Sequence, residues 1–211
     1  MNKEKGVLTV LSGFSGAGKG TIMKHLLLAH PDTYNLSISA TTRYKREGEE
    51  DGREYFFKTR NEFDEMIAQG EFLEYATFNG NSYGTPKAYV EKLLNEGKDV
   101  ILEIEVQGAL QVKHLYPDCL LLFVTPPSAE ALKERLVGRG TESEEVIAER
   151  LSISSRESSL MDKYDYLIIN DDLDEAVEEV HELIQREHLR TAHRKNMISD
   201  IQTQLKQFSD I

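Results

Sequence analysis

The strongest constraint on the fold is a glycine-rich loop between an apolar run and a helical pattern. Residues Val7 to Ser12 are mostly apolar, and the segment Gly13-Phe-Ser-Gly-Ala-Gly-Lys-Gly-Thr21 follows them. Apolar residues then recur at helical spacing until His30-Pro31. A strand, a glycine loop and a helix in this order can direct several backbone N–H groups and a helix N-terminus at one anion. The sequence therefore predicts a nucleotide-phosphate site, and a merely tight glycine turn is the alternative.

The loop offers side-chain groups as well as backbone donors. Lys19 supplies a mobile charge for the β- and γ-phosphates of a nucleotide. Gly20 stands where Ser or Thr usually contacts Mg²⁺, and a hydroxyl appears one residue later at Thr21. We therefore expect Mg²⁺ to be held largely by water and phosphate. The predicted donor-nucleotide residues of the loop are Gly13, Phe14, Ser15, Gly16, Ala17, Gly18, Lys19, Gly20 and Thr21.

Later apolar runs predict an α/β fold with a parallel sheet. The predicted strands after the first are Leu36–Ala40, Val100–Glu105, Leu120–Val124 and Tyr166–Asn170. Helical patterns separate most of these runs, so we expect a five-stranded parallel sheet with helices on both faces. The stretch from Arg43 to Tyr83 breaks the alternation and is interpreted as an inserted lobe with a small mixed sheet.

Capping signals predict where several helices begin. Thr85-Pro86 has the pattern of an N-cap followed by a proline at the first helical position. The pairs Thr59-x-x-Glu62, Thr141-x-x-Glu144 and Asp172-x-x-Glu175 resemble capping boxes. The last stretch, from about Asp172 to Ile211, is predicted to be mostly helical. Its final turns could pack on the body or on another subunit, which would make the protein a homo-oligomer.

Charge and composition exclude several classes of partner. The net charge of −12 in a chain of 211 residues argues against general affinity for nucleic acid or an anionic membrane. No apolar run approaches 18 residues, and the start of the chain lacks the apolar region of a signal peptide. The single cysteine, Cys119, lies in an apolar run, as expected of a buried thiol in a reducing compartment. We therefore expect one compact cytoplasmic unit that gathers its basic residues locally to bind anions.

A second set of motifs indicates the phosphate acceptor. Arg43 and Arg46 follow a predicted strand, and the segments Gly52-Arg-Glu-Tyr55, Glu71-Phe-Leu-Glu74 and Asn81-Ser-Tyr83-Gly-Thr85 come next. Then Glu103-Ile-Glu105-Val-Gln-Gly108 ends a strand with two carboxylates predicted on one face. In this order, from about Gly6 to His188, the sequence closely resembles the guanylate kinase family. Lys45 departs from the family pattern, in which proline is common between the two arginines.

The resemblance implies an enzyme that transfers the γ-phosphoryl group of ATP to GMP, with Mg²⁺ as cofactor and the fold of P-loop kinases. It also implies a core of about residues 1–40, 86–126 and 162–211, a GMP-binding lobe of about 41–85 and a helical lid of about 127–161. By resemblance, the GMP phosphate is held by Arg43, Arg46, Tyr55 and Tyr83, and the guanine is read by Ser39, Glu74 and Thr85, with Glu105 lining the acceptor site.

The acceptor residues suit the chemistry of GMP. Arginine forks match phosphate oxygens in bidentate fashion, and tyrosine hydroxyls add neutral donors. Guanine presents N1–H and a 2-amino group side by side, which the single carboxylate of Glu74 can accept together. Adenine has an acceptor at N1, so the same carboxylate would face it lone pair to lone pair. Buried mismatches of this kind reject a base by ~10⁴-fold or more.

The lid residues Arg135, Arg139 and Arg150 are implied to contact the transferring phosphate, and Asn170 to touch the adenine of ATP. Glu103, with Thr21, is a candidate contact of Mg²⁺, directly or through water. No general base is assigned, because the attacking oxygen of GMP is largely anionic at pH 7.

Simpler alternatives exist for each residue taken alone. Arg43 and Arg46 could belong to a solvated charged loop, since Glu49 and other acidic residues follow them. Arg135 and Arg150 could form surface pairs with nearby glutamates, and Asn170 could cap the next helix. A non-catalytic interaction module on the same fold is a further alternative, as is a kinase for another small phosphate acceptor.

Overall fold

The fold was analysed in a computed structural model, which describes residues 4–78, 80–138, 140 and 143–209. Its main sheet has five parallel strands, in the order β2-β7-β1-β8-β9. The strands are β1 Leu8–Gly13, β2 Tyr34–Leu36, β7 Asp99–Glu103, β8 Leu120–Thr125 and β9 Tyr166–Ile169. The predicted α/β fold with a five-stranded parallel sheet is therefore confirmed.

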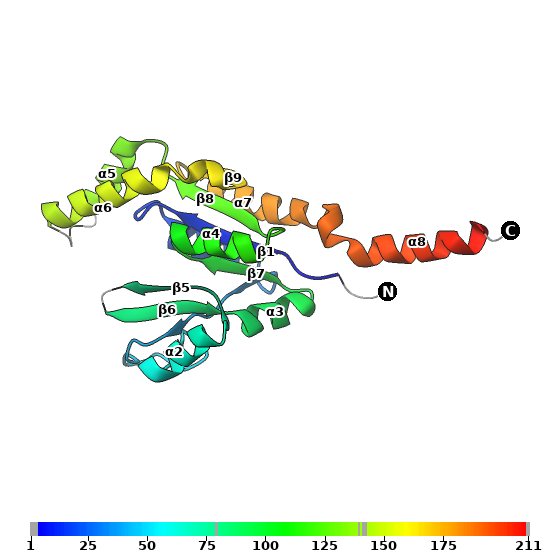
Figure 1. Cartoon of the computed structure of the whole chain (residues 1–211). Helices are drawn as coiled ribbons and strands as arrows, with labels where there is room; N and C mark the ends of the chain where they lie inside the picture. The colour runs from blue at the N-terminus through cyan, green and yellow to red at the C-terminus, as the bar shows by residue number, and fades with distance from the viewer. Residues whose placement is uncertain (1–3, 79, 139, 141–142, 210–211) are drawn as a thin grey trace.

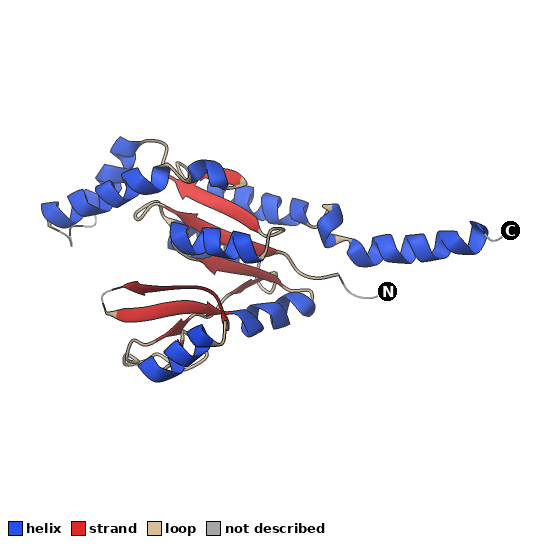
Figure 2. Ribbon diagram, viewed as in Figure 1, coloured by secondary structure: helices blue, strands red, loops and turns tan. Residues whose placement is uncertain are grey.

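Helices cover both faces of this sheet because the apolar side chains of its central strand alternate (Figure 2). Leu8 and Val10 of β1 belong to one buried cluster, and Leu11 belongs to the other. The first cluster includes side chains of α3 (Lys87–Asn95) and α4 (Val106–Leu115), and the second includes those of α1 (Lys19–Ala29) and α7 (Leu173–Glu187). The glycine loop thus leaves a strand that is buried on both sides.

Two predicted strand boundaries were wrong. The run Leu36–Ala40 is not one strand: β2 ends at Leu36, and Ala40–Thr41 forms β3 of a second sheet. The Ser37 N–H bonds the Ile101 carbonyl, after which the chain leaves the main sheet. Strand β7 ends at Glu103, so Glu105 instead precedes the first helical residue of α4 as its N-cap. Backbone pairing sets these boundaries, and apolar character alone does not reveal it.

The second sheet forms a lobe below the core in Figure 1 and has mixed pairing, as predicted. Its order is β4-β3-β6-β5, with β4 at Phe56–Phe57, β5 at Phe72–Phe78 and β6 at Asn81–Pro86. Helix α2 (Arg60–Ala68) begins with the predicted capping box of Thr59 and Glu62. Phe63 and Phe72 stack at 4.5 Å and make the small core of the lobe. This core is separate from the two clusters of the main sheet.

On the opposite side of the core lie α5 (Ala129–Gly138) and α6 (Glu144–Ser158). Short 3₁₀ helices at Met161–Lys163 and Thr191–His193 flank β9 and α7. Helix α8 (Lys195–Ser209) extends away from the body, with apolar side chains such as Ile201 and Leu205 exposed (Figure 1). Within the described residues, no helix combines the length and apolar character needed to cross a membrane.

A partly buried ion pair joins His188, at the end of α7, to Asp99, at the start of β7, and predicts a pH effect on stability. His188 Nε2 lies 2.9 Å from one oxygen of Asp99, whose other oxygen accepts the Val7 N–H. The hydrogen bond with Asp99 raises the pKa of His188 above its ordinary value. Protonated His188 is therefore favoured in the folded chain, and its stabilisation is full below about pH 6.5, the unfolded pKa, and is lost as pH rises through the folded pKa.

We expect the difference in unfolding free energy between the wild type and His188→Gln to shrink as pH rises from 5.5 to 8.5. Urea denaturation at each pH measures it, and His25→Gln, an exposed histidine of α1, is the matched control. A difference that stays constant or grows with pH would contradict the ion pair.

Candidate functional site

The glycine loop adopts the backbone conformation that anion binding requires. Gly13, Gly16 and Gly18 have φ values of 140°, 93° and 98°, which side chains with a Cβ rarely adopt. Lys19, the first residue of α1, donates from Nζ to the carbonyls of Gly13 (2.7 Å) and Phe14 (3.1 Å). The ammonium group therefore lies over the loop, at the N-terminus of a helix of 11 residues.

Two predicted site residues support the loop from behind. The buried amide of Asn170, just after β9, donates to the Ala17 carbonyl at 2.7 Å. A Cβ at Gly18 would lie 2.3 Å from that amide nitrogen, so this contact requires glycine. Arg135 of α5 donates to the carbonyls of Asn170 (2.6 Å) and Ala17 (3.3 Å). In the structure both side chains hold the loop in place, and Asp172, not Asn170, caps α7.

Helix α6 also contacts the loop. The Arg150 guanidinium donates to Ser15 Oγ at 2.6 Å, so this side chain extends from α6 to the loop. This contact is not the surface pairing with glutamate that the sequence left open. Arg139, the third lid arginine predicted from the sequence, lies outside the described residues.

Glu103 and Glu157 interact electrostatically with Lys19, and both also interact with Glu105. Partial desolvation raises the pKa of Glu103, the last residue of β7, while Lys19 lowers it and Glu105 raises it. Desolvation, followed by the charge of Glu105, also raises the pKa of Glu157 on α6, and Lys19 opposes the shift. The carboxylates repel one another and share one ammonium group, so additional positive charge at this point would stabilise them.

No group of three or more His, Cys, Asp and Glu side chains in the described ranges is arranged to hold a metal ion. Thr21 is exposed in the first turn of α1. Glu103 lies beside the same turn, with an oxygen 3.5 Å from where a Cβ on Gly20 would be. These two side chains suit water-mediated contact with a cation that has other ligands of its own.

A second anion-binding group lies in the lobe. The Arg43 guanidinium bonds both oxygens of Glu49 at 2.7 and 3.0 Å, and the same carboxylate accepts the Arg46 N–H at 2.8 Å. Arg43 also lies over the Tyr55 ring, 5.3 Å from its centroid, and the Tyr55 and Tyr83 rings are 6.0 Å apart. The hydrogen bond from Arg43 lowers the pKa of Glu49. The Arg43 guanidinium is therefore already paired with an anionic group, the Glu49 carboxylate.

The structure does not bring every predicted acceptor residue into this group. The Arg46 side chain is exposed, and only its backbone N–H reaches Glu49. Ser39 contributes a backbone bond, its carbonyl accepting the Phe56 N–H, while its side chain is half-buried.

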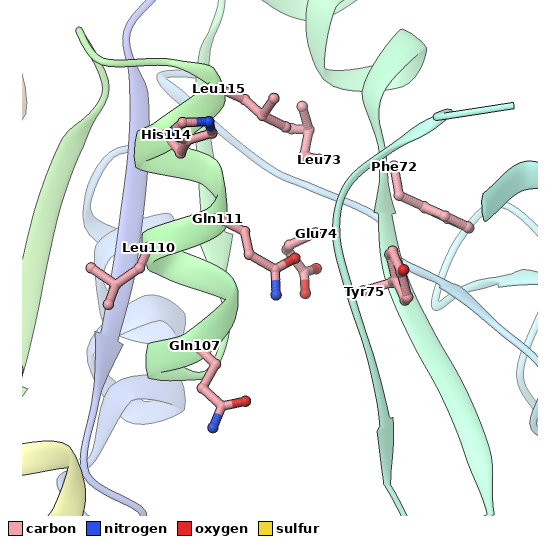
Figure 3. Close-up of a pocket in the computed structure, with 9 residues that line it drawn as sticks. All are labelled: Phe72, Leu73, Glu74, Tyr75, Gln107, Leu110, Gln111, His114 and Leu115. Atoms are coloured by element: carbon pink, nitrogen blue, oxygen red, sulfur yellow. The ribbon is translucent and has the colours of Figure 1, made fainter. Parts of the chain in front are cut away.

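Glu74 of β5 is buried where the lobe packs on helix α4 of the core. Its side chain projects from β5 toward α4 beside a cavity of about 490 Å³ (Figure 3). The Thr85 hydroxyl donates to one of its oxygens at 2.7 Å. Thr85 was predicted to cap α3, but Pro86 occupies the N-cap position, which leaves the hydroxyl for Glu74. Burial raises the pKa of Glu74, and the bond from Thr85 opposes it. The backbone N–H of Thr85 also bonds this carboxylate, and the two oxygens together still have acceptor capacity left for a ligand.

Sequence reasoning missed two residues of these sites. Glu49 was considered only as part of a charged loop, and Glu157 was not considered. The spacing of Arg46 and Glu49, which matches a tight turn, could have indicated the first contact. No local sequence pattern could have indicated Glu157, because it interacts with Lys19 only through the folding of α6 onto a segment far away in the sequence.

Comparisons with known proteins identify the family. The family model described as guanylate kinase matches residues 5–187. A guanylate kinase of Streptococcus thermophilus is 52% identical over 201 residues, covering 93% of this chain and 96% of the relative. One from Bacillus cereus is 54% identical over 191 residues, covering 90% and 93%. The crystal structure of guanylate kinase from Anaplasma phagocytophilum is similar with a TM-score of 0.70 at 31% identity, and 92% of each chain is covered.

Proposed function

The chain belongs to the guanylate kinase family and transfers a phosphoryl group from ATP to GMP, and we propose that the two groups of residues described above bind these substrates. We also propose that the chain is organised as a core of about residues 1–40, 86–126 and 162–211, a GMP-binding lobe of about 41–85, and a lid of about 127–161.

The observation that carries the acceptor assignment is the Arg43 guanidinium, which lies over the Tyr55 ring and whose Nη2 already bonds both oxygens of the Glu49 carboxylate. A phosphate offers the same guanidinium more oxygens and more charge than the Glu49 carboxylate. We propose that the 5′-phosphate of GMP binds there, with Arg46 and Tyr83 closing around it. Glu74 and Thr85 then read the guanine, and Ser39 and Glu105 line the rest of the acceptor site.

For the donor, the loop from Gly13 to Thr21 is proposed to surround the phosphates of ATP, with Lys19 on the β- and γ-phosphates. Arg150 and Arg139 are proposed to contact the transferring group. Arg135 and Asn170 are proposed to shape the loop in addition to contacting the donor, because Asn170 bonds the Ala17 carbonyl and Arg135 bonds the carbonyls of Ala17 and Asn170. The negative charges of Glu103 and Glu157 interact with the single ammonium group of Lys19, so an added cation would be stabilised beside it.

Mg²⁺ is the proposed cofactor. Its fit rests on the surplus of carboxylates at Glu103, Glu105 and Glu157 and on the side-chain oxygens near the loop, Thr21 among them. When bound with ATP, Mg²⁺ supplies positive charge to the phosphate oxygens. We further propose that the chain acts in the cytoplasm without nucleic acid or membrane partners, and that the exposed apolar face of α8 is available for a homo-oligomer.

The proposed reaction needs positioning and charge rather than a general base. An oxygen of the GMP phosphate forms a bond to the γ-phosphorus of ATP, and the bond from that phosphorus to the β,γ-bridging oxygen breaks, which releases ADP. Lys19 and the lid arginines stabilise the charge on the moving group. Closure of the lobe and lid around both nucleotides would exclude water, the competing acceptor.

A coupled assay with Mg-ATP tests the acceptor. We expect GMP to be phosphorylated with a kcat/KM ~10⁴-fold or more above that for AMP, because a carboxylate cannot accept from adenine N1. UMP and CMP belong in the same comparison, and replacing Mg²⁺ by EDTA should abolish turnover. Equal activity on AMP and GMP would overturn the assignment of Glu74.

A further inference from the structure

A glycine in the first turn of α4 has no backbone reason to be there. Gly108 is not among the described residues with positive φ, so its conformation is open to any side chain. In a helix, glycine is less favourable than alanine. The remaining reason for a glycine at this position is space.

The Glu74 carboxylate occupies that space. A Cβ on Gly108 would lie 2.8 Å from Oε2 of Glu74 and 3.3 Å from its Cδ and Cγ. On the other side, Oε1 of Glu74 accepts the Thr85 hydroxyl at 2.7 Å. Figure 3 shows Glu74 projecting across the gap between β5 and α4. The carboxylate is therefore held between a hydroxyl on β6 and bare backbone on the helix.

We propose that Gly108 is a positioning residue for base recognition, and that the absence of its side chain sets the place of the Glu74 carboxylate. This inference rests on the proposed role of Glu74 as the reader of guanine. Two parallel hydrogen bonds to N1–H and the 2-amino group require both oxygens within about 0.5 Å of their places. A methyl group on Gly108 would push the carboxylate out of that position.

The displacement should affect recognition without unfolding the chain. The atoms that must move belong to the end of a flexible side chain, and alanine is a better helix former than glycine. Misplacement of a binding group by about 1 Å can cost up to ~10²-fold. We therefore expect Gly108→Ala to raise the KM for GMP about tenfold or more and to leave the KM for ATP unchanged. The melting temperature of this variant should be no lower than that of the wild type.

The test is steady-state kinetics on a double-mutant cycle of Gly108→Ala and Glu74→Gln. If Gly108 acts through Glu74, the alanine has little further effect once Glu74 is replaced. Lys92→Ala, an exposed change on the neighbouring helix α3 and away from this cavity, is the control and should keep the wild-type KM.

A KM for GMP within about twofold of the wild type in Gly108→Ala, or the same loss with and without Glu74, would overturn the proposal. Failure of the proposed function looks different. In that case the wild type does not prefer GMP, or Glu74→Gln alone leaves the KM for GMP unchanged.

Discussion

Replacing Lys19 by alanine is expected to lower kcat by about 10³-fold or more while the Kd for GMP changes by less than about threefold. The Lys19 ammonium lies over the loop, bonded to the Gly13 and Phe14 carbonyls, and it is the proposed charge on the β- and γ-phosphates. Its loss leaves the charge that develops during transfer with fewer partners. The proposed GMP contacts come from the lobe, apart from Ser39 and Glu105, and do not involve the Lys19 side chain.

Steady-state kinetics gives kcat, and calorimetric titration with GMP in the absence of ATP gives the Kd. Lys24→Ala, an exposed lysine on the same helix, controls for removal of a positive charge near the loop. If GMP affinity fell together with kcat, the separation of donor and acceptor sites would be wrong.

Glu74→Gln is expected to reduce kcat/KM for GMP by roughly 10²-fold or more and to narrow the preference for GMP over AMP. A glutamine keeps one acceptor but places an N–H₂ donor opposite the donors of guanine. Two hydrogen bonds to a charged group, each worth about 1.5–3 kcal/mol, are thereby weakened or lost. The burial of Glu74 strengthens the effect, because water cannot replace the missing acceptor.

The matched control for this change is Glu71→Gln, which alters an exposed carboxylate just before β5. Kinetics with GMP and AMP at saturating Mg-ATP measures both changes. A Glu74→Gln enzyme with wild-type kcat/KM for GMP would show that guanine is read elsewhere.

The phosphate loop and main sheet could be predicted because their signals are local. The glycines that need positive φ are visible in the sequence, as are the apolar runs of β1, β7 and β8. Boundaries that depend on a partner strand could not be read in this way, which is why Leu36–Ala40 was wrongly taken as one strand. Helix α6 similarly begins at Glu144 behind Ser143, two residues after the expected cap at Thr141.

The candidate sites were predictable where chemistry and a family pattern coincide, and less so where contacts join distant segments. The clustering of Arg43, Tyr55 and Tyr83 follows the expectation. The bonds of Asn170 and Arg135 to the back of the loop depend on how β9 and α5 pack, which no local pattern encodes. The same is true of Glu157.

The position of β1 in the middle of the sheet has a consequence for the newly made chain. Leu8 pairs with Val100 in β7, and Thr9 pairs with Leu120 in β8, so neither neighbour exists when β1 leaves the ribosome. Pairings between such distant segments form slowly and leave apolar surface open in the meantime. The strand that carries the phosphate loop therefore has no partner until β7, which ends at residue 103 of 211, has been synthesised, and its second partner β8 comes later still.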